Sequence, residues 1–162
     1  MIVVADTSVI LNLSCVEQLD LLAGLFPEVV VPLEVVREFE QCAKQIPRFA
    51  GLSLPAWIRQ QSCHGIPENL AQEGLDPGET AAIALALELH ADAVLIDERH
   101  GYTVARQLGL NTVGILGLLL RAKAAGLLVN VKPVLDELRD KAHFWLSEKV
   151  RLQVLRLAGE AG

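Results

Sequence analysis

The sequence predicts an α/β fold with three layers, in which helices cover both faces of a central, mostly parallel sheet. Short β-branched runs alternate with helical patterns along the chain, as in proteins built from βαβ units. One helical pattern, at residues 78–89, is apolar on almost every side, which is typical of a helix buried against a sheet. Apolar residues make up 52% of the 162 residues, enough for the core of one domain. We therefore expect residues 1–162 to form a single domain.

The strands are predicted from short, apolar, β-branched runs, and the helices from apolar residues at helical spacing. We predict strands at residues 2–5, 29–31, 93–96 and 112–115, with a weaker candidate at 56–60. We predict helices at residues 9–13, 16–25, 33–45, 78–89, 101–108, 116–124, 134–141 and 145–157. The segment 46–74 is rich in Pro, Gly and polar residues and is the least regular part of the chain.

The apolar helix starts with a capping pattern. Asp76 suits the N-cap, Pro77 the first helical position and Glu79 the third, as in a capping box. This pattern gives Asp76 a structural role, so we leave it out of the candidate site. Glu79 has two alternative roles, because a carboxylate in the first turn either completes the capping box or projects into a cleft.

The last predicted helix, at about residues 145–158, carries more apolar side chains than one buried stripe requires. They are Leu146, Val150, Leu152, Val154, Leu155 and Leu157. We expect part of this helix to pack on a second subunit or on a partner protein.

Composition and charge exclude several classes of protein. The apolar content excludes disorder, and a net charge of −6 argues against nucleic-acid binding by bulk positive charge. The N-terminus has no basic region, so we expect no signal peptide. The longest apolar run, residues 112–120, is far shorter than the roughly 20 residues that span a bilayer. Three scattered cysteines fit reduced thiols, so we expect a cytoplasmic protein that does not enter the membrane.

The charges are divided unevenly between the two parts of the chain. Residues 1–98 carry a net charge of −11 and residues 99–162 a net charge of +5, which together give −6. Scattered solvated surface would explain this division. An acidic pocket beside a basic shelf would explain it too, and would suit a metal-assisted enzyme that acts on a polyanion.

Acidic residues follow three of the predicted strands. Asp6 directly follows the first strand and Asp97 the third, while Glu38 lies on the helix after the second. Ligands of open parallel sheets bind beyond the carboxyl ends of the strands, so Asp6 and Asp97 should lie close together if their strands are neighbours. Clustered carboxylates repel one another unless a hard cation such as Mg²⁺ or Mn²⁺ neutralises them. Each acid also has a structural interpretation, Asp6 or Asp97 as a helix N-cap and Glu38 as solvated surface.

Four segments carry the acids and their surroundings: VVADTS at 3–8, PLEVVRE at 32–38, GLDPGETAAIALA at 74–86, and LIDER at 95–99 followed by ARQLGL at 105–110. Together they resemble PIN domains, and within them the prokaryotic branch related to VapC-type toxins. One motif such as Asp-Thr-Ser is a weak signal, but four in this order and at these separations are a strong one. The similarity runs from residue 2 to about residue 140.

The resemblance implies a PIN-like three-layer fold and a ribonuclease that depends on Mg²⁺ or Mn²⁺. By motif position, the acids around the metal and the catalytic residues are Asp6, Glu38, Glu79 and Asp97, with Glu98 as a further ligand. Asp97 is favoured over Glu98 as the direct ligand because it ends the apolar strand. Ser8 or Thr7 is expected to support the first acid by a hydrogen bond.

The resemblance also implies partners. RNA is the expected substrate, PIN domains are commonly dimeric, and toxin members pair with a small antitoxin that covers the site. Many PIN domains carry Asp where this chain has Glu79, and the extra methylene moves the carboxylate further from the backbone. Arg99 and Arg106 follow the strand-end acids and are interpreted either as phosphate-binding residues or as ion-pair partners of a site carboxylate.

Three other functions are compatible with part of the sequence pattern. A phospho-receiver domain also has an acidic pocket, but it usually needs a Lys after its last strand, where this chain has Leu116 and Gly117. A phosphatase with an aspartyl nucleophile usually shows Asp-x-Asp, where this chain has Asp6, Thr7 and Ser8. A PIN fold kept as an RNA- or protein-binding module with weak catalysis shares every motif with the nuclease, so it remains an alternative.

Overall fold

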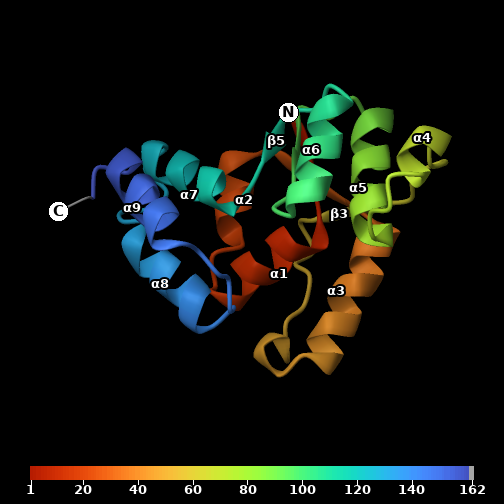
Figure 1. The fold of residues 1–162 in the computed structure, drawn as a ribbon. Coiled ribbons are helices and arrows are strands. Elements are labelled where there is room, and N and C mark those ends of the chain that lie inside the picture. The colour runs from red at the N-terminus through yellow and green to blue at the C-terminus, as the bar shows by residue number, and fades with distance from the viewer. Residues whose placement is uncertain (161–162) are drawn as a thin grey trace.

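The computed structural model describes residues 1–160 and confirms the α/β fold. Parallel strands form one sheet with the order β3-β2-β1-β4-β5, and helices flank it on both faces (Figure 1). The strand order reverses between β1 and β4, because β2 and β3 extend the sheet on one side of β1 and β4 and β5 on the other. The strands are β1 (Ile2–Ala5), β2 (Glu28–Pro32), β3 (Arg59–Gln61), β4 (Ala93–Leu95) and β5 (Thr112–Val113).

Helices connect the strands and continue beyond the last one. They are α1 (Thr7–Cys15), α2 (Asp20–Leu25), α3 (Leu33–Gln45), α4 (Glu68–Ala71), α5 (Pro77–Glu88), α6 (Arg99–Gln107), α7 (Ile115–Ala124), α8 (Lys132–Asp140) and α9 (Glu148–Leu157), with a 3₁₀ turn at Pro47–Phe49. None of the helices within residues 1–160 is both long and apolar enough to cross a bilayer.

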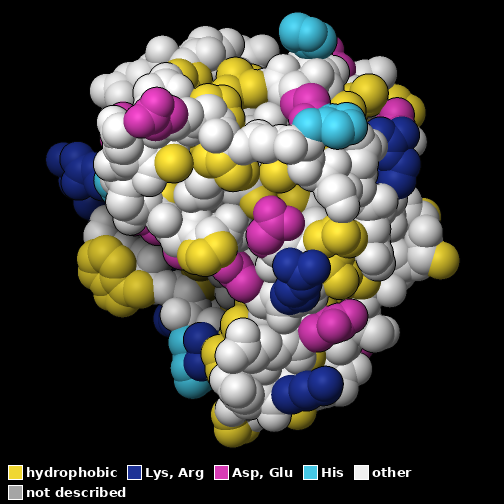
Figure 2. Space-filling model, turned by 90° about the vertical axis from the view of Figure 1, so that its right-hand side faces the viewer, with side chains coloured by type: hydrophobic (Ala, Val, Ile, Leu, Met, Phe, Trp, Pro, Cys, Tyr) yellow, Lys and Arg dark blue, Asp and Glu magenta, His cyan; other side chains and the backbone are white. Residues whose placement is uncertain are grey.

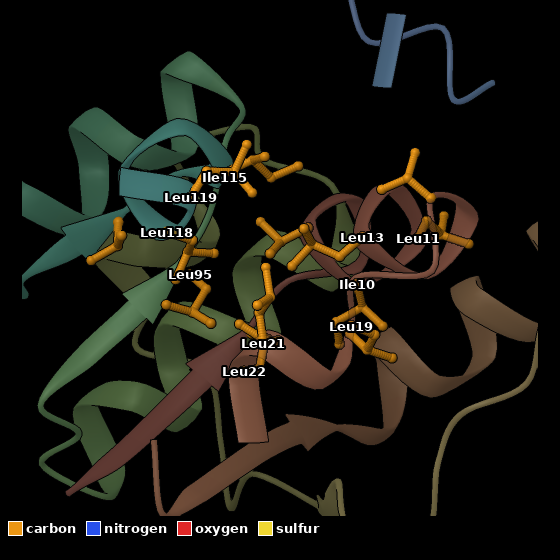
Figure 3. Close-up of a cluster of buried hydrophobic side chains, with 14 of the residues drawn as sticks. Ile10, Leu11, Leu13, Leu19, Leu21, Leu22, Leu95, Ile115, Leu118 and Leu119 are labelled. Atoms are coloured by element: carbon orange, nitrogen blue, oxygen red, sulfur yellow. The ribbon is translucent and has the colours of Figure 1, made fainter. Parts of the chain in front are cut away.

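Alternate residues of the strands face opposite sides of the sheet and build two hydrophobic clusters. Val3 and Ala5 of β1 face the larger cluster, which takes in side chains from α1, α2, α3, α7, α8 and α9. Val4 faces the smaller cluster, with side chains from α4, α5 and α6. Within the larger cluster, Leu95 of β4 lies among side chains of α1, α2 and α7, including Ile10, Leu13, Leu21, Leu22, Ile115, Leu118 and Leu119 (Figure 3).

The apolar pattern of residues 78–89 has the expected cause. Its helix, α5, packs against β1, β2 and β4 on one side and against α3, α4 and α6 on others. Every residue from 81 to 86 is buried. A helix enclosed in this way leaves little surface for polar side chains, and the acid buried in it is Glu79 in the first turn.

Several predicted boundaries are corrected by the structure. The helix predicted at 16–25 begins only at Asp20, because Glu17 adopts a left-handed backbone conformation (φ 57°) that interrupts the helix after α1. The strand predicted at 112–115 ends at Val113, because Gly114 is already the N-cap of α7. The weak strand candidate corresponds to β3, shifted toward the C-terminus.

The last helix begins later than residue 145. Its N-cap is Ser147, whose hydroxyl accepts a hydrogen bond from the Val150 backbone N–H at 3.2 Å. Val154 and Leu155 are buried against the core, whereas Leu152 and Leu157 are exposed. The helix therefore keeps an outward apolar face.

Candidate active site

The first two acids of the site lie on neighbouring strands. β1 and β4 are paired in parallel, and the Asp6 backbone N–H donates to the Leu95 carbonyl at 2.9 Å. Asp6 and Asp97 therefore leave the sheet side by side, at its carboxyl edge. This is also where the strand order reverses, which is the place where open parallel sheets bind ligands.

Asp6 is almost completely buried, with 3% of its surface exposed. It stands at the N-cap position of α1 but makes no side-chain capping hydrogen bond, so capping does not explain it. Its Oδ1 atom has no hydrogen-bond partner within residues 1–160. A buried polar atom without a partner is costly, so it needs another explanation.

Asp97 and Glu98 divide their roles clearly. Glu98 is the N-cap of α6 and accepts from the Gly101 backbone N–H at 2.9 Å. Asp97 does not cap that helix, and its Oδ1 instead accepts from the backbone N–H of Ile115, the first residue of α7, at 3.0 Å. The other Asp97 oxygen, Oδ2, is buried and has no partner in the described part of the chain.

Glu38 reaches the site from α3 and is held at both of its oxygens. The Thr7 hydroxyl donates to Oε2 at 2.8 Å, and the Gly78 backbone N–H donates to Oε1 at 2.9 Å. The Thr7 hydroxyl thus contacts the second acid, whereas the resemblance associates it or Ser8 with the first. The Ser8 hydroxyl is buried and has no partner among the described residues.

Glu79 lies in the first turn of α5, with 5% of its surface exposed. Asp76 caps this helix as predicted, because its Oδ1 accepts from the Glu79 backbone N–H at 2.8 Å. The Glu79 side chain turns into the site instead of closing the capping box. Burial, hydrogen bonds with the Asp76 and Glu98 side chains and the charges of Asp76 and Asp6 raise the pKa of Glu79 to about 9.

Asp76 is the site residue that sequence reasoning missed. Its negative charge raises the pKa of Asp6 as well as that of Glu79. The spacing gave a signal, because residues three apart in the first turn of a helix share one face. A capping role and a place at the mouth of the site are therefore compatible.

Burial raises the pKa values of the site acids, and neighbouring charges add to it at some of them. Burial raises the pKa of Asp6 to about 7, and the charges of Asp76, Glu38 and Asp97 add to the effect. Burial raises the pKa of Asp97 to about 6. The cluster thus holds more carboxylate than the surrounding groups neutralise. Such shifts are concentrated at functional sites.

A family model described as a PIN domain matches residues 2–160. The chain belongs to the PIN domain family. Searches of curated proteins and of solved structures give no significant match. PIN domains are generally nucleases and typically use divalent metal ions, which supports a hydrolase for this chain at that level.

The residues present fit such an ion chemically. No three His, Cys, Asp or Glu side chains within residues 1–160 are arranged to hold a metal ion as they stand. However, Asp6 Oδ1, Glu79 Oε2 and Asp97 Oδ2 are buried oxygens without hydrogen-bond partners in this range. Oxygen donors of this kind are what Mg²⁺ and Mn²⁺ prefer. A bound cation would also offset the burial, and at Asp6 and Glu79 the repulsion, that raise these pKa values.

The two candidate arginines, Arg99 and Arg106, occupy different places in this PIN domain. Arg99 is the first residue of α6, is exposed, and forms no salt bridge with a described residue, so the expected ion pair is absent in that range. Arg106 lines a cavity of about 560 Å³ together with Arg121, Asp92 and Asn111. The last two residues precede β4 and β5, so this cavity lies at the opposite edge of the sheet. The prediction that Arg106 serves the acid cluster is wrong.

The side of the molecule formed by α3, α4 and α5 carries acidic side chains near its centre, with a basic side chain beside them (Figure 2). His100 lies 3.8 Å from Glu73 and is exposed, which fits a surface role. His64 pairs with Glu88 at 3.0 Å. Neither histidine therefore adds a ligand to the acid cluster.

Proposed function

We propose that this PIN domain is an endoribonuclease that depends on Mg²⁺ or Mn²⁺ and cleaves single-stranded or structured RNA. The observation that carries the proposal is the set of buried carboxylates at the switch point, whose oxygens lack partners and whose pKa values are raised. A protein tolerates such a cluster when a cation completes it. An uncharged binding surface would not require it.

Asp6, Glu79 and Asp97 would hold the cation, because each offers a buried oxygen without another partner. Bound there, a divalent ion would lower the pKa of a water molecule and neutralise charge on the scissile phosphate. Glu38 would hold the ion directly or through a water molecule, with its orientation fixed by Thr7 and Gly78. Glu98 is engaged at the start of α6, which suits an outer ligand.

Protons must leave the site when a cation enters. Glu79 carries a proton at neutral pH in the metal-free protein, because its pKa is raised to about 9. Ligand carboxylates bind metals in their ionised form, so binding releases this proton and grows tighter as pH rises.

Arg99, which is exposed and free of salt bridges to described residues, would bind an RNA phosphate next to the acids.

The biological setting that we propose is the toxin of a toxin–antitoxin pair, with a small antitoxin that covers the acid cluster. Its support is the resemblance of the motifs to VapC-type toxins. Expression of the chain alone should arrest growth, and expression of the Asp97→Asn variant should not. Equal growth with both proteins would count against the toxin role and would leave the nuclease proposal standing.

RNA cleavage by the purified protein tests the nuclease. Cleavage with Mn²⁺ should be lost with EDTA and in the Asp97→Asn variant. Asp140→Asn is a matched control, because Asp140 is an exposed acid at the end of α8 that pairs with Arg139. Cleavage that survives EDTA and Asp97→Asn would point to a contaminant. No cleavage, together with RNA binding, would favour the binding module.

A further inference from the structure

Three glycines outside the acid set each lie against one of its carboxylates. Gly78 is the second residue of α5, Gly101 the third residue of α6, and Gly114 the N-cap of α7. A Cβ atom built on Gly114 would lie 2.6 Å from Asp97 Oδ1, and one on Gly101 would lie 2.5 Å from Glu79 Oε2. A Cβ atom on Gly78 would lie 2.7 Å from the Glu38 carboxyl carbon. All of these separations are closer than van der Waals contact allows.

Backbone conformation does not require glycine at these positions. The glycines with positive φ are Gly51, Gly74, Gly109, Gly126 and Gly159, and the three glycines of the site are not among them. Gly114 has φ −93°, which any residue adopts. Inside a helix, Ala is favoured over Gly, so Gly78 and Gly101 reduce the stability of their helices.

Close approach of the acids explains the three glycines. The start of a helix carries free N–H groups and a partial positive charge, both of which stabilise a carboxylate. Glu38 uses this contact at Gly78 N, and Asp97 uses it at Ile115 N, next to Gly114. Only a residue without a side chain lets the carboxylate come so near to the helix start.

We propose that Gly78, Gly101 and Gly114 are positioning residues of the metal site, and that Gly101 is what allows a glutamate at position 79. The proposal rests on the proposed metal-dependent function. Glu79 is one methylene longer than aspartate, and its Oε2 occupies the space that a side chain on Gly101 would need. A methyl group at any of the three positions displaces the facing carboxylate, because that carboxylate ends a side chain that can rotate whereas the backbone cannot move as easily.

Calorimetric titration with Mn²⁺ tests the proposal, with thermal unfolding of the metal-free protein as a second measurement. Gly78→Ala and Gly114→Ala should weaken Mn²⁺ binding about tenfold or more while the metal-free protein stays folded. Gly65→Ala is the matched control, because no heavy atom lies within 4 Å of a Cβ atom built there. It should leave Mn²⁺ binding unchanged. Wild-type affinity in both site variants would overturn the proposal.

The pair of residues 79 and 101 gives a rescue experiment. A Cβ atom on Gly101 would also meet Ile96 Cδ1 at 2.6 Å, so Gly101→Ala is expected to lower the thermal stability as well. Adding Glu79→Asp withdraws the carboxylate from the new methyl group and should restore part of both the stability and the Mn²⁺ affinity. A double variant no better than Gly101→Ala alone would contradict the proposal, including the case in which neither protein folds.

The two proposals fail in different ways. A wild-type protein that binds no Mn²⁺ contradicts the metal-dependent function. Tight wild-type binding that the glycine variants share contradicts only the positioning role.

Discussion

Glu160 and the acids of the active site differ in whether hydrogen-bond donors and cations offset the burial of the carboxylate. Glu160, after α9, has 10% of its side chain exposed and accepts hydrogen bonds from Lys123 Nζ at 2.9 Å, Val131 N at 2.7 Å and Lys132 N at 3.0 Å. Burial alone would raise its pKa, but these donors more than offset burial and lower it. At the active site, burial raises the pKa values of Asp6 and Glu79 and no Lys or Arg is paired with them among the described residues.

The difference shows that this fold can neutralise a buried carboxylate whose role is structural. Glu160 ties the start of α8 to the C-terminal segment and has its full set of donors. The acids of the active site also lie at helix starts, yet three of their oxygens lack partners within residues 1–160. Natural proteins accept such a cost at functional sites, where the missing partner is a ligand.

The largest expected effect is on catalysis. Asp6→Asn or Asp97→Asn should reduce Mn²⁺-dependent RNA cleavage by about a thousandfold, because each removes a metal ligand and its negative charge. Glu160→Gln should leave cleavage within about twofold of wild type, since this residue lies in the C-terminal segment. Cleavage rates at saturating Mn²⁺ measure both effects. Loss of cleavage in Glu160→Gln would remove the distinction between the two regions.

Substitutions in the two regions should have opposite effects on the stability of the metal-free protein. Glu79→Gln should raise the unfolding free energy of the metal-free protein at pH 8 by roughly 1–3 kcal/mol, because the wild-type carboxyl group must take up a proton to enter the folded site whereas the neutral amide need not. Glu160→Gln should lower the unfolding free energy, because the Lys123 ammonium group and the backbone N–H groups at the start of α8 lose their anionic acceptor. Urea unfolding of both variants measures the difference. A destabilised Glu79→Gln would argue against electrostatic strain in the metal-free site.

The pH dependence of the metal-free protein should follow the raised pKa values. Asp6 titrates near 3.8 when unfolded and near 7 when folded, and Glu79 near 4.5 and near 9. Between about pH 4 and pH 9 the folded state holds more protons than the unfolded state, so the unfolding free energy falls as pH rises. Glu160, whose pKa is lowered, acts oppositely and stabilises the fold above its unfolded pKa. Stability should therefore be greatest near pH 4, and a flat profile up to pH 9 would contradict the shifts.

Metal should restore the stability that alkaline pH removes. Mn²⁺ at a hundred times its Kd should raise the unfolding free energy by about 2.7 kcal/mol, because it binds the folded state. At equal Mn²⁺ concentration the gain should be larger at pH 8 than at pH 6, since fewer protons compete. Thermal scans with and without EDTA measure it. An equal gain at both values of pH would show that the raised acids are not ligands.

The smallest expected effect concerns the apolar face of α9. Leu157→Asp should leave the unfolding free energy within about 0.5 kcal/mol of wild type, because Leu157 is exposed. If this face joins two subunits, which is one of the two expectations for the last helix, the variant should be monomeric by light scattering where the wild type is dimeric. A monomeric wild type at micromolar concentration would contradict the homodimer.

Sequence periodicity determined the layers of this fold. It placed α3 at Leu33–Gln45 with the bounds that the structure shows, and it predicted the buried helix α5 within one residue at each end. The sequence also predicted that Asp6 and Asp97 lie together if their strands are neighbours, because parallel strands bring their carboxyl ends to one edge, and the structure pairs β1 with β4. Helix α2 was predicted to begin too early. The break before it comes from the left-handed backbone of a single residue, Glu17, which does not change the spacing of apolar residues from which helices are predicted.

Tertiary structure alone decided what each acid does. The sequence could not show that Glu98 caps α6 while Asp97 reaches across to α7, because both residues follow the same strand. It could not show that Asp76 lies near the other acids, since the same sequence pattern fits an aspartate that only caps a helix and one that also belongs to a site. Burial and distance set the pKa values and the glycine contacts, and both arise only when β1, β4 and the starts of α5, α6 and α7 meet.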